Sequence, residues 1–153
     1  MADLALTWNP ATGDADLSIV NGDLALDQGL VTAVIVSLFT DAPADPGDDI
    51  PDGSGDPRGY WGDMPVAAAS QTGAAPDVTG SKLWLLERAL VTTETLARAE
   101  SYAKACLAWM IRDGVAGAVN ARAISPRLGW IELFVQIVQT GAAPTFTFAW
   151  QNS

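Results

Sequence analysis

The 153-residue chain contains no histidine and only one cysteine, Cys106. Without histidine, neither a Ser-His-Asp or Cys-His catalytic set nor a histidine-ligated metal site can form. A single cysteine cannot form an intrachain disulfide. Cys106 lies between Ala105 and Leu107, which predicts a packed thiol rather than a nucleophile. The missing residue types therefore exclude the commonest routes to catalysis.

Basic residues are scarce, above all in the first half of the chain. Residues 1–79 hold thirteen acidic residues and one basic residue, Arg58, for a net charge of −12, whereas residues 80–153 hold five acidic and seven basic residues, for +2. With an isoelectric point near 4.1, the chain lacks the basic surface that nucleic-acid phosphates require. The acidic half is either a solvated loop or a surface that steers a basic neighbour.

Long apolar runs are also missing. The longest nearly apolar stretch runs from Leu30 to Phe39 and is too short to span a bilayer. The first residues lack the charged and apolar regions of a signal peptide. We therefore expect no membrane partner.

The first forty residues combine strand and helix patterns. Alternating patterns typical of strands run over residues 4–8 and 16–19, and Asn21-Gly22 is a strong type I′ turn signal, so we expect a hairpin over about 15–27. Residues 28–39 show helical spacing, with Asp27 as the expected N-cap. Their β-branched residues leave a buried strand as an alternative.

Residues 41–80 form a Gly-, Pro- and Asp-rich arm that contains six of the nine prolines. Its acidic residues do not have the spacing of a calcium loop. Because it has few apolar residues, we expect the arm to be mobile in isolation and ordered only in an assembly. Its aromatic pair, Tyr60 and Trp61, either anchors the arm to the domain or contacts another chain.

The second half has the clearest periodicity. Residues 93–112 carry one apolar helical stripe, which Gly114 ends. Three strand patterns follow over 117–124, 129–140 and 145–150. The sequence thus predicts a single α+β domain over residues 1–153, with an N-terminal β-hairpin and helix, a long acidic loop, and one main helix packed on a C-terminal antiparallel three-stranded sheet.

The last strand pattern has neither charge nor proline to protect an edge, and we expect it to pair with a neighbouring chain. Its residues Phe146, Phe148 and Trp150 fall on one face. For an enzyme, the remaining route is a carboxylate pair. Only Glu87 and Glu132 lie in runs apolar enough to supply a general acid.

Three Trp-bearing segments share an order and spacing with a known family: Arg58-Gly-Tyr-Trp-Gly-Asp63, Gly80-Ser-Lys-Leu-Trp-Leu-Leu-Glu-Arg88 and Leu107-Ala-Trp-Met-Ile-Arg-Asp-Gly-Val-Ala116. With them the chain resembles the Mu-type phage tail proteins encoded by gene 46, which are related to the small wedge proteins of contractile-tail baseplates. The resemblance implies a virion structural protein without a cofactor, assembled in the host cytoplasm and present in six copies per baseplate. It also implies that the protein helps to initiate the sheath.

The implied partners are other wedge proteins and sheath subunits, with tube-initiator or spike hub proteins as further candidates. In the wider family a Trp-Glu-Pro-Arg-like segment after the helix docks on the wedge bundle; here only Trp109 and Arg112 of that segment are kept. The family's C-terminal sheet resembles the strand-exchange domain of sheath subunits. The candidate partner-binding residues are Tyr60, Trp61, Trp109, Arg112, Phe146, Phe148 and Trp150. A lysozyme-like glycosidase and an acidic inhibitor or immunity-type protein remain alternatives.

Overall fold

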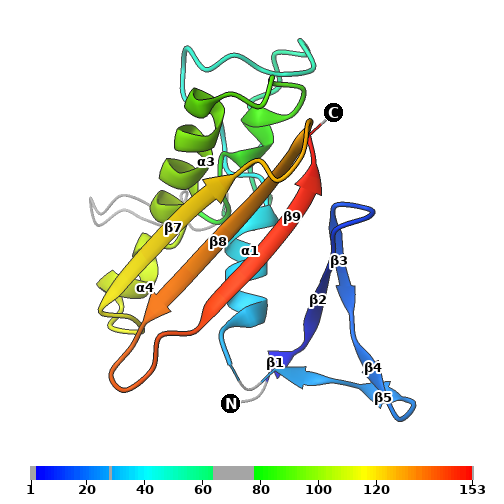
Figure 1. Ribbon diagram of the computed structural model, residues 1–153, viewed down its shortest axis with the longest axis vertical. Coiled ribbons are helices and arrows are strands. Elements are labelled where there is room, and N and C mark those ends of the chain that lie inside the picture. The colour runs from blue at the N-terminus through cyan, green and yellow to red at the C-terminus, as the bar shows by residue number, and fades with distance from the viewer. Residues whose placement is uncertain (1–2, 28, 64–77, 153) are drawn as a thin grey trace.

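The computed structural model describes residues 3–27, 29–63 and 78–152 and has the α+β organisation that the sequence predicts (Figure 1). Its second half consists of a short 3-10 helix and two α-helices, followed by three strands. These are η1 (Leu83–Leu86), α3 (Thr93–Cys106), α4 (Ala108–Arg112), β7 (Ala118–Ile124), β8 (Trp130–Val138) and β9 (Thr145–Gln151). Among the described residues, no helix combines the length and apolarity needed to cross a membrane.

The three C-terminal strands form one antiparallel sheet in the order β7-β8-β9. The alternating pattern in β8 correctly predicts which face is buried, since its alternate residues Ile131, Leu133, Val135 and Ile137 are all fully buried. Helices α1 and α3 lie on one side of this sheet, and their buried residues join the same core (Figure 1). The sheet and its helical cover are therefore held together mainly by apolar burial.

The helix predicted over 93–112 is two helices. Thr92 caps α3, because its Oγ1 accepts a hydrogen bond from the Thr95 N–H at 3.2 Å. Leu107 separates the two helices, as the C-cap of α3 and the N-cap of α4, with φ −97° and ψ 0°. Leu107 and Met110 are both fully buried, and we attribute the interruption to the packing of these two side chains. Gly114, at φ +75°, ends α4 as predicted.

Helix α1 (Val31–Phe39) is a helix and not the alternative strand, but it begins later than predicted. Asp27 belongs to strand β6, where it pairs with Asp3, so it does not cap the helix. The N-cap is Leu30, which makes no capping hydrogen bond through its side chain. Pairing in β6 therefore overrides the local capping preference.

Residues 3–27 form three short two-stranded ladders, and we call this segment the N-terminal ribbon. The strands are β1 (Asp3–Leu4), β2 (Leu6–Asn9), β3 (Asp14–Leu17), β4 (Ile19–Val20), β5 (Asp23–Leu24) and β6 (Leu26–Asp27), and they pair as β1-β6, β2-β3 and β4-β5. The predicted Asn21-Gly22 turn is confirmed, with φ values of +54° and +81°. The hairpin around it is shorter than the predicted 15–27, because only β4 and β5 pair across the turn, whereas β3 pairs with β2 and β6 with β1.

The three ladders of the N-terminal ribbon meet at Ala5, Ser18 and Ala25. Each of these residues donates its N–H to the carbonyl of the next around a closed ring, at 2.8–3.0 Å. Figure 1 shows the resulting triangle to one side of the C-terminal sheet, with β2 nearest to the body and the β4-β5 corner pointing away. The ring of backbone hydrogen bonds fixes the three ladders relative to one another.

Candidate functional site

Strand β9 is an edge strand, as its place in the β7-β8-β9 order requires. The Asn152 N–H donates to the Gly129 carbonyl at 2.7 Å, and the Ile137 N–H donates to the Pro144 carbonyl at 3.0 Å. The backbone N–H and C=O groups of the even-numbered residues in this segment therefore face β8. Because antiparallel backbone groups alternate, those of Thr147 and the other odd-numbered residues of β9 face outward. In the described part of the chain no strand pairs with β9 from that side.

The aromatic side chains of β9 are used mainly inside the protein. Phe148 is buried, and its ring makes edge contacts with Trp8 and Phe39 at centroid distances of 6.0 and 5.5 Å. Trp150 packs on Phe39 at 5.8 Å, and Phe146 is half-buried against the core. These aromatics hold β9 on the body, so the part that remains accessible for pairing is its outer backbone edge.

The N-terminal ribbon approaches the same edge. Trp8 stacks on Phe39 with ring centroids 3.8 Å apart, and its Nε1–H donates to the Ala149 carbonyl at 3.0 Å. A groove of about 430 Å³ lies here, lined by residues that include Trp8, Phe39 and Trp150. Thus one outward carbonyl of β9 is already occupied, and a groove with both aromatic and polar lining adjoins the strand.

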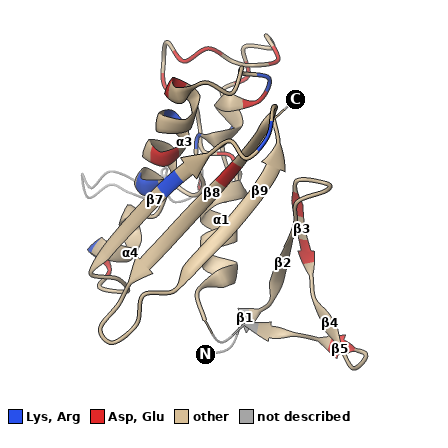
Figure 2. Cartoon of the chain, in the orientation of Figure 1, with Lys and Arg blue, Asp and Glu red and all other residues tan. Residues whose placement is uncertain are grey.

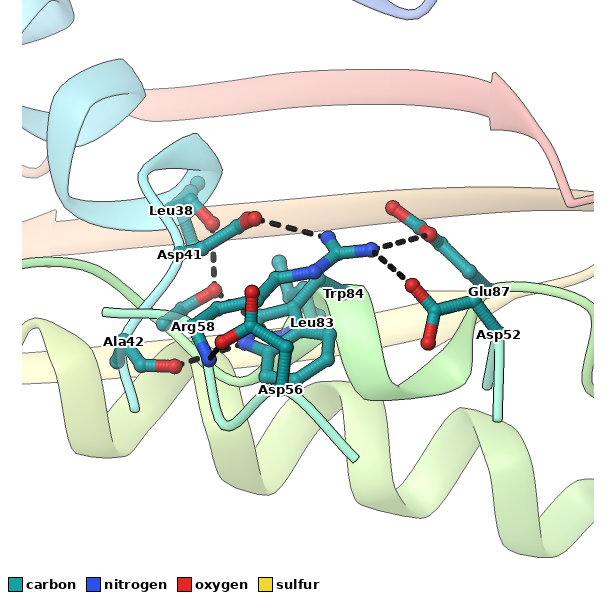
Figure 3. A network of polar contacts seen from close by, with 10 residues as sticks. Leu38, Asp41, Ala42, Asp52, Asp56, Arg58, Leu83, Trp84 and Glu87 are labelled. Carbon is teal, nitrogen blue, oxygen red and sulfur yellow. Dashed lines mark hydrogen bonds and ion pairs between the residues drawn. The ribbon is translucent and has the colours of Figure 1, made fainter. Parts of the chain in front are cut away.

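The arm is fastened to the body by Arg58 (Figure 3). Its guanidinium donates to Asp41 at 2.9 Å, lies 3.6–3.7 Å from the carboxylates of Asp52 and Glu87, and covers the Trp84 ring at 4.4 Å. The hydrogen bond with Asp41 outweighs the effect of burial and raises the Arg58 pKa. One cation therefore joins the start of the arm, its middle and the segment after η1.

Lys82 makes a second connection, through ion pairs with Asp45 and Asp48. Burial opposes its charge, but the hydrogen bonds that Lys82 donates to these two carboxylates prevail and raise the Lys82 pKa. The Asp45 backbone N–H and then Lys82 lower the Asp48 pKa. Ion pairs thus replace the apolar contacts that the arm lacks, and they favour an arm that is ordered over residues 41–58 in the free protein rather than only in an assembly.

Tight backbone packing closes the base of the arm at Gly80. The Gly80 φ is +99°, and an added Cβ would lie 2.2 Å from the Thr40 carbonyl oxygen. Ser81 N–H donates to this carbonyl at 2.8 Å, and Ala42 N–H donates to the Ser81 carbonyl at 2.9 Å. Only glycine fits this approach of two backbone segments.

Arg58 and Lys82, with their carboxylate partners, form a clamp on the arm. This clamp predicts that residues 41–58 resist proteolysis in the free protein. Replacing Arg58 by Met, which retains length without charge, is expected to speed cleavage by endoproteinase Asp-N within 45–56 several-fold. Mass spectrometry of the fragments measures this, with Arg127→Met as a control because Arg127 lies over the Trp130 ring and not over Trp84. Rapid cleavage of the wild-type arm would contradict the clamp.

Tyr60 and Trp61 stand at the end of the described arm, with ring centroids 5.5 Å apart. Trp61 is 74% exposed and Tyr60 is exposed at 37%. Of the two interpretations of this pair, the exposure of Trp61 favours a contact with another chain.

Trp109 and Arg112 lie one turn apart on α4 but differ in environment. Trp109 is half-buried and donates from Nε1 to the Ser37 hydroxyl on α1 at 3.2 Å. The Arg112 side chain is more than half exposed, and its Nε lies 3.2 Å from Asp113. Trp109 thus positions α4 on the body, while the Arg112 side chain lies at the surface beside Asp113.

The structure gives little support to catalytic or metal chemistry in the residues it describes. Glu87 is more than half exposed and pairs with Arg58 instead of lying in an apolar pocket. Glu132 is half-buried on the opposite face of β8 from the core residues. Across the described residues no group of three or more acidic or cysteine side chains is arranged to hold a metal ion.

Cys106 is expected to be an unreactive thiol. Burial raises the pKa of Cys106 from 9.0 to about 12. Because the thiolate is the nucleophile, alkylation by iodoacetamide at pH 8 should be on the order of a thousandfold slower than that of a free cysteine. Unfolding in urea should restore the ordinary rate, and a native rate close to that of free cysteine would show that this burial is absent.

Sequence reasoning missed one surface, the exposed aliphatic side chains of the N-terminal ribbon. Alternation in this segment predicts half-buried strands, yet six of its aliphatic side chains are exposed: Leu4, Leu17, Ile19, Val20, Leu24 and Leu26. A signal was present in the two- to four-residue strands between closely spaced turns, because such short strands rarely build a second layer.

Comparison with known proteins gives consistent matches over most of the chain. The model of a family described as phage protein GP46 matches residues 30–144. Baseplate protein gp46 of Escherichia phage Mu is 39% identical over 141 residues, covering 90% of this chain and 87% of that protein. The Mu-like prophage FluMu protein gp46 of Haemophilus influenzae is 38% identical over 138 residues, with the same coverage.

Proposed function

Since this chain belongs to the phage protein GP46 family, we propose that it is a structural subunit of a phage tail baseplate, placed in a wedge of a contractile tail. The observation that carries the proposal is the 39% identity, over 90% of the chain, to a protein named as a baseplate protein of phage Mu. The single domain over residues 1–153 would be one wedge component, present in six copies and assembled into the virion tail in the host cytoplasm.

We propose further that β9 joins this subunit to the tail sheath. A strand from a sheath subunit would add to the outward edge of β9, where backbone hydrogen bonds supply affinity and alternate side chains set the register. The edge suits this role because Phe148 and its aromatic neighbours fix β9 before the partner arrives. An edge ordered in advance reduces the entropy lost on binding. In this way the subunit would help to initiate sheath assembly.

Other wedge proteins would contact the exposed aromatic pair and the surface of α4. Trp61 and Tyr60 offer large side chains of the kind enriched at interfaces. Arginine, the residue type of Arg112, is enriched at interfaces as well. Trp109 supports this surface through its hydrogen bond to Ser37. Tube-initiator or spike hub proteins are further candidate partners.

Deleting the gene from the phage that encodes this chain tests the proposal. The expected result is that lysates contain no sheathed tails by negative-stain electron microscopy, and that the wild-type gene supplied in trans restores them. Mass spectrometry of purified wild-type virions should detect the chain. Normal sheathed tails without the gene would contradict the proposal.

We propose that the subunit acts without catalysis. The purified protein is expected to release no soluble fragments from peptidoglycan between pH 4 and pH 8, a range that covers the usual pKa values of carboxylic acids in glycosidases. Turnover that disappears in Glu87→Gln or Glu132→Gln would instead support the glycosidase alternative.

A further inference from the structure

The N-terminal ribbon exposes a concentration of aliphatic side chains. Six of its residues are between 39% and 71% exposed: Leu4, Leu17, Ile19, Val20, Leu24 and Leu26. They make up almost half of the exposed large hydrophobic residues in the part of the chain that the structure describes. Such a concentration of exposed aliphatic side chains within one short segment marks an interaction site more often than scattered surface leucines do.

Strand pairing gathers these side chains. Ile19 is directly opposite Leu24, and Leu4 is directly opposite Leu26, so the members of each pair point to the same face. The two ladders that carry these pairs have only two residues per strand. A two-stranded ribbon without a covering layer is marginally stable in water. Docking on another surface would cover these side chains and stabilise the ladders.

The body nonetheless holds the ribbon in place from one side. Leu6 N–H donates to the Thr32 hydroxyl at 3.2 Å, and Trp8 stacks on Phe39. Both contacts come from β2, whereas the β4-β5 corner points away from the sheet (Figure 1). The exposed side chains are therefore presented in a fixed position, which lowers the entropy lost on docking.

The charge of the ribbon indicates the kind of surface that it fits. Asp14, Asp16 and Asp23 are exposed, and residues 1–57 include no lysine or arginine. Figure 2 shows the ribbon with acidic positions and without basic ones. In contrast, the arm acids Asp41 and Asp48 are paired with Arg58 and Lys82. The ribbon carboxylates thus keep a charge that this chain does not neutralise in its described part.

We propose that the N-terminal ribbon is a docking surface for a different baseplate subunit that presents an apolar groove rimmed by lysine and arginine. This inference rests on the proposed baseplate role. It concerns a segment that precedes the matched residues 30–144. A second copy of this chain fits poorly, because it would bring the same uncompensated carboxylates face to face. An anionic membrane surface would repel them as well.

The test uses the full chain and, as probe, the baseplate subassembly purified from cells that express the other baseplate proteins of the same phage without this chain. The variant Ile19→Thr with Val20→Thr keeps β-branched residues but removes apolar area. Its affinity for the probe, measured by biolayer interferometry, is expected to fall at least tenfold, roughly the effect of losing one buried side chain. Asp16→Asn with Asp23→Asn should weaken the salt dependence of binding.

Leu128→Thr is the matched control, because Leu128 is fully exposed on the hairpin between β7 and β8. It should bind like the wild type, and all variants should keep the wild-type circular dichroism spectrum and melting temperature. A wild-type chain that fails to bind the probe would overturn the baseplate role itself. If the wild type binds and the Ile19/Val20 variant binds equally well, only the ribbon proposal fails. Self-association or vesicle binding that this variant abolishes would also overturn it.

Discussion

Replacing Thr147 by proline is expected to leave the protein folded and to reduce sheathed tails to the level of the gene deletion. The Thr147 N–H faces away from β8, so a proline there removes no hydrogen bond of the sheet. The same N–H would donate to the added strand of a sheath subunit, and the proline ring would occupy the space that this strand needs. The change therefore acts on the partner interface far more than on the fold.

Thr147→Val is the control for this prediction, because it alters the side chain but keeps the N–H donor. We expect the Val variant to support normal tails and both variants to melt within a few degrees of the wild type, which corresponds to about 1 kcal/mol or less. Tail counts by negative-stain electron microscopy measure the assembly effect. Normal sheathed tails with the proline variant, or unfolding of that variant, would show that β9 is not used as an open edge.

The largest expected loss of stability follows from replacing Trp84 by alanine. Trp84 is buried, its Nε1–H donates to the Ala42 carbonyl at 2.8 Å, and its ring lies under the Arg58 guanidinium. Removal of the indole opens a cavity, leaves the Ala42 carbonyl without this donor and loosens the arm. The free energy of unfolding is expected to fall by about 3–5 kcal/mol.

Urea denaturation followed by circular dichroism measures this effect. Trp61→Ala is the matched control, since Trp61 is 74% exposed and should change the unfolding free energy by no more than about 0.5 kcal/mol. The Trp61 variant should instead weaken incorporation into tails. Similar stability losses for the two variants would mean that Trp61 is an anchor of the fold, as the other interpretation of the aromatic pair holds.

The sequence predicts most of the fold because burial leaves a periodic trace in it. Residues Ile131 to Ile137 alternate with the pleat of β8, and the apolar stripe of α3 follows the helical repeat. The Asn21-Gly22 turn is encoded equally locally, in residues that tolerate positive φ. The edge position of β9 is also predictable, because it is the last of three consecutive antiparallel strands.

Features that depend on distant contacts are not visible in such patterns. The interruption between α3 and α4 at Leu107 reflects tertiary packing, which no local propensity specifies. Arg58 and Glu87 are 29 positions apart in the sequence, so the fastening of the arm could not be predicted from its composition. The same limit applies to the candidate site: alternation places Phe148 on one face of β9, but only the structure shows that Trp8 and Phe39 cover that face.

A cryo-electron microscopy map of the intact baseplate of the encoding phage, at a resolution that separates strands, is the most direct test of the proposed role. The account predicts that this chain lies in each wedge, with a strand from a sheath subunit paired along the outward edge of β9. A baseplate that lacks the chain, or one in which the β9 edge faces solvent in every copy, would contradict it.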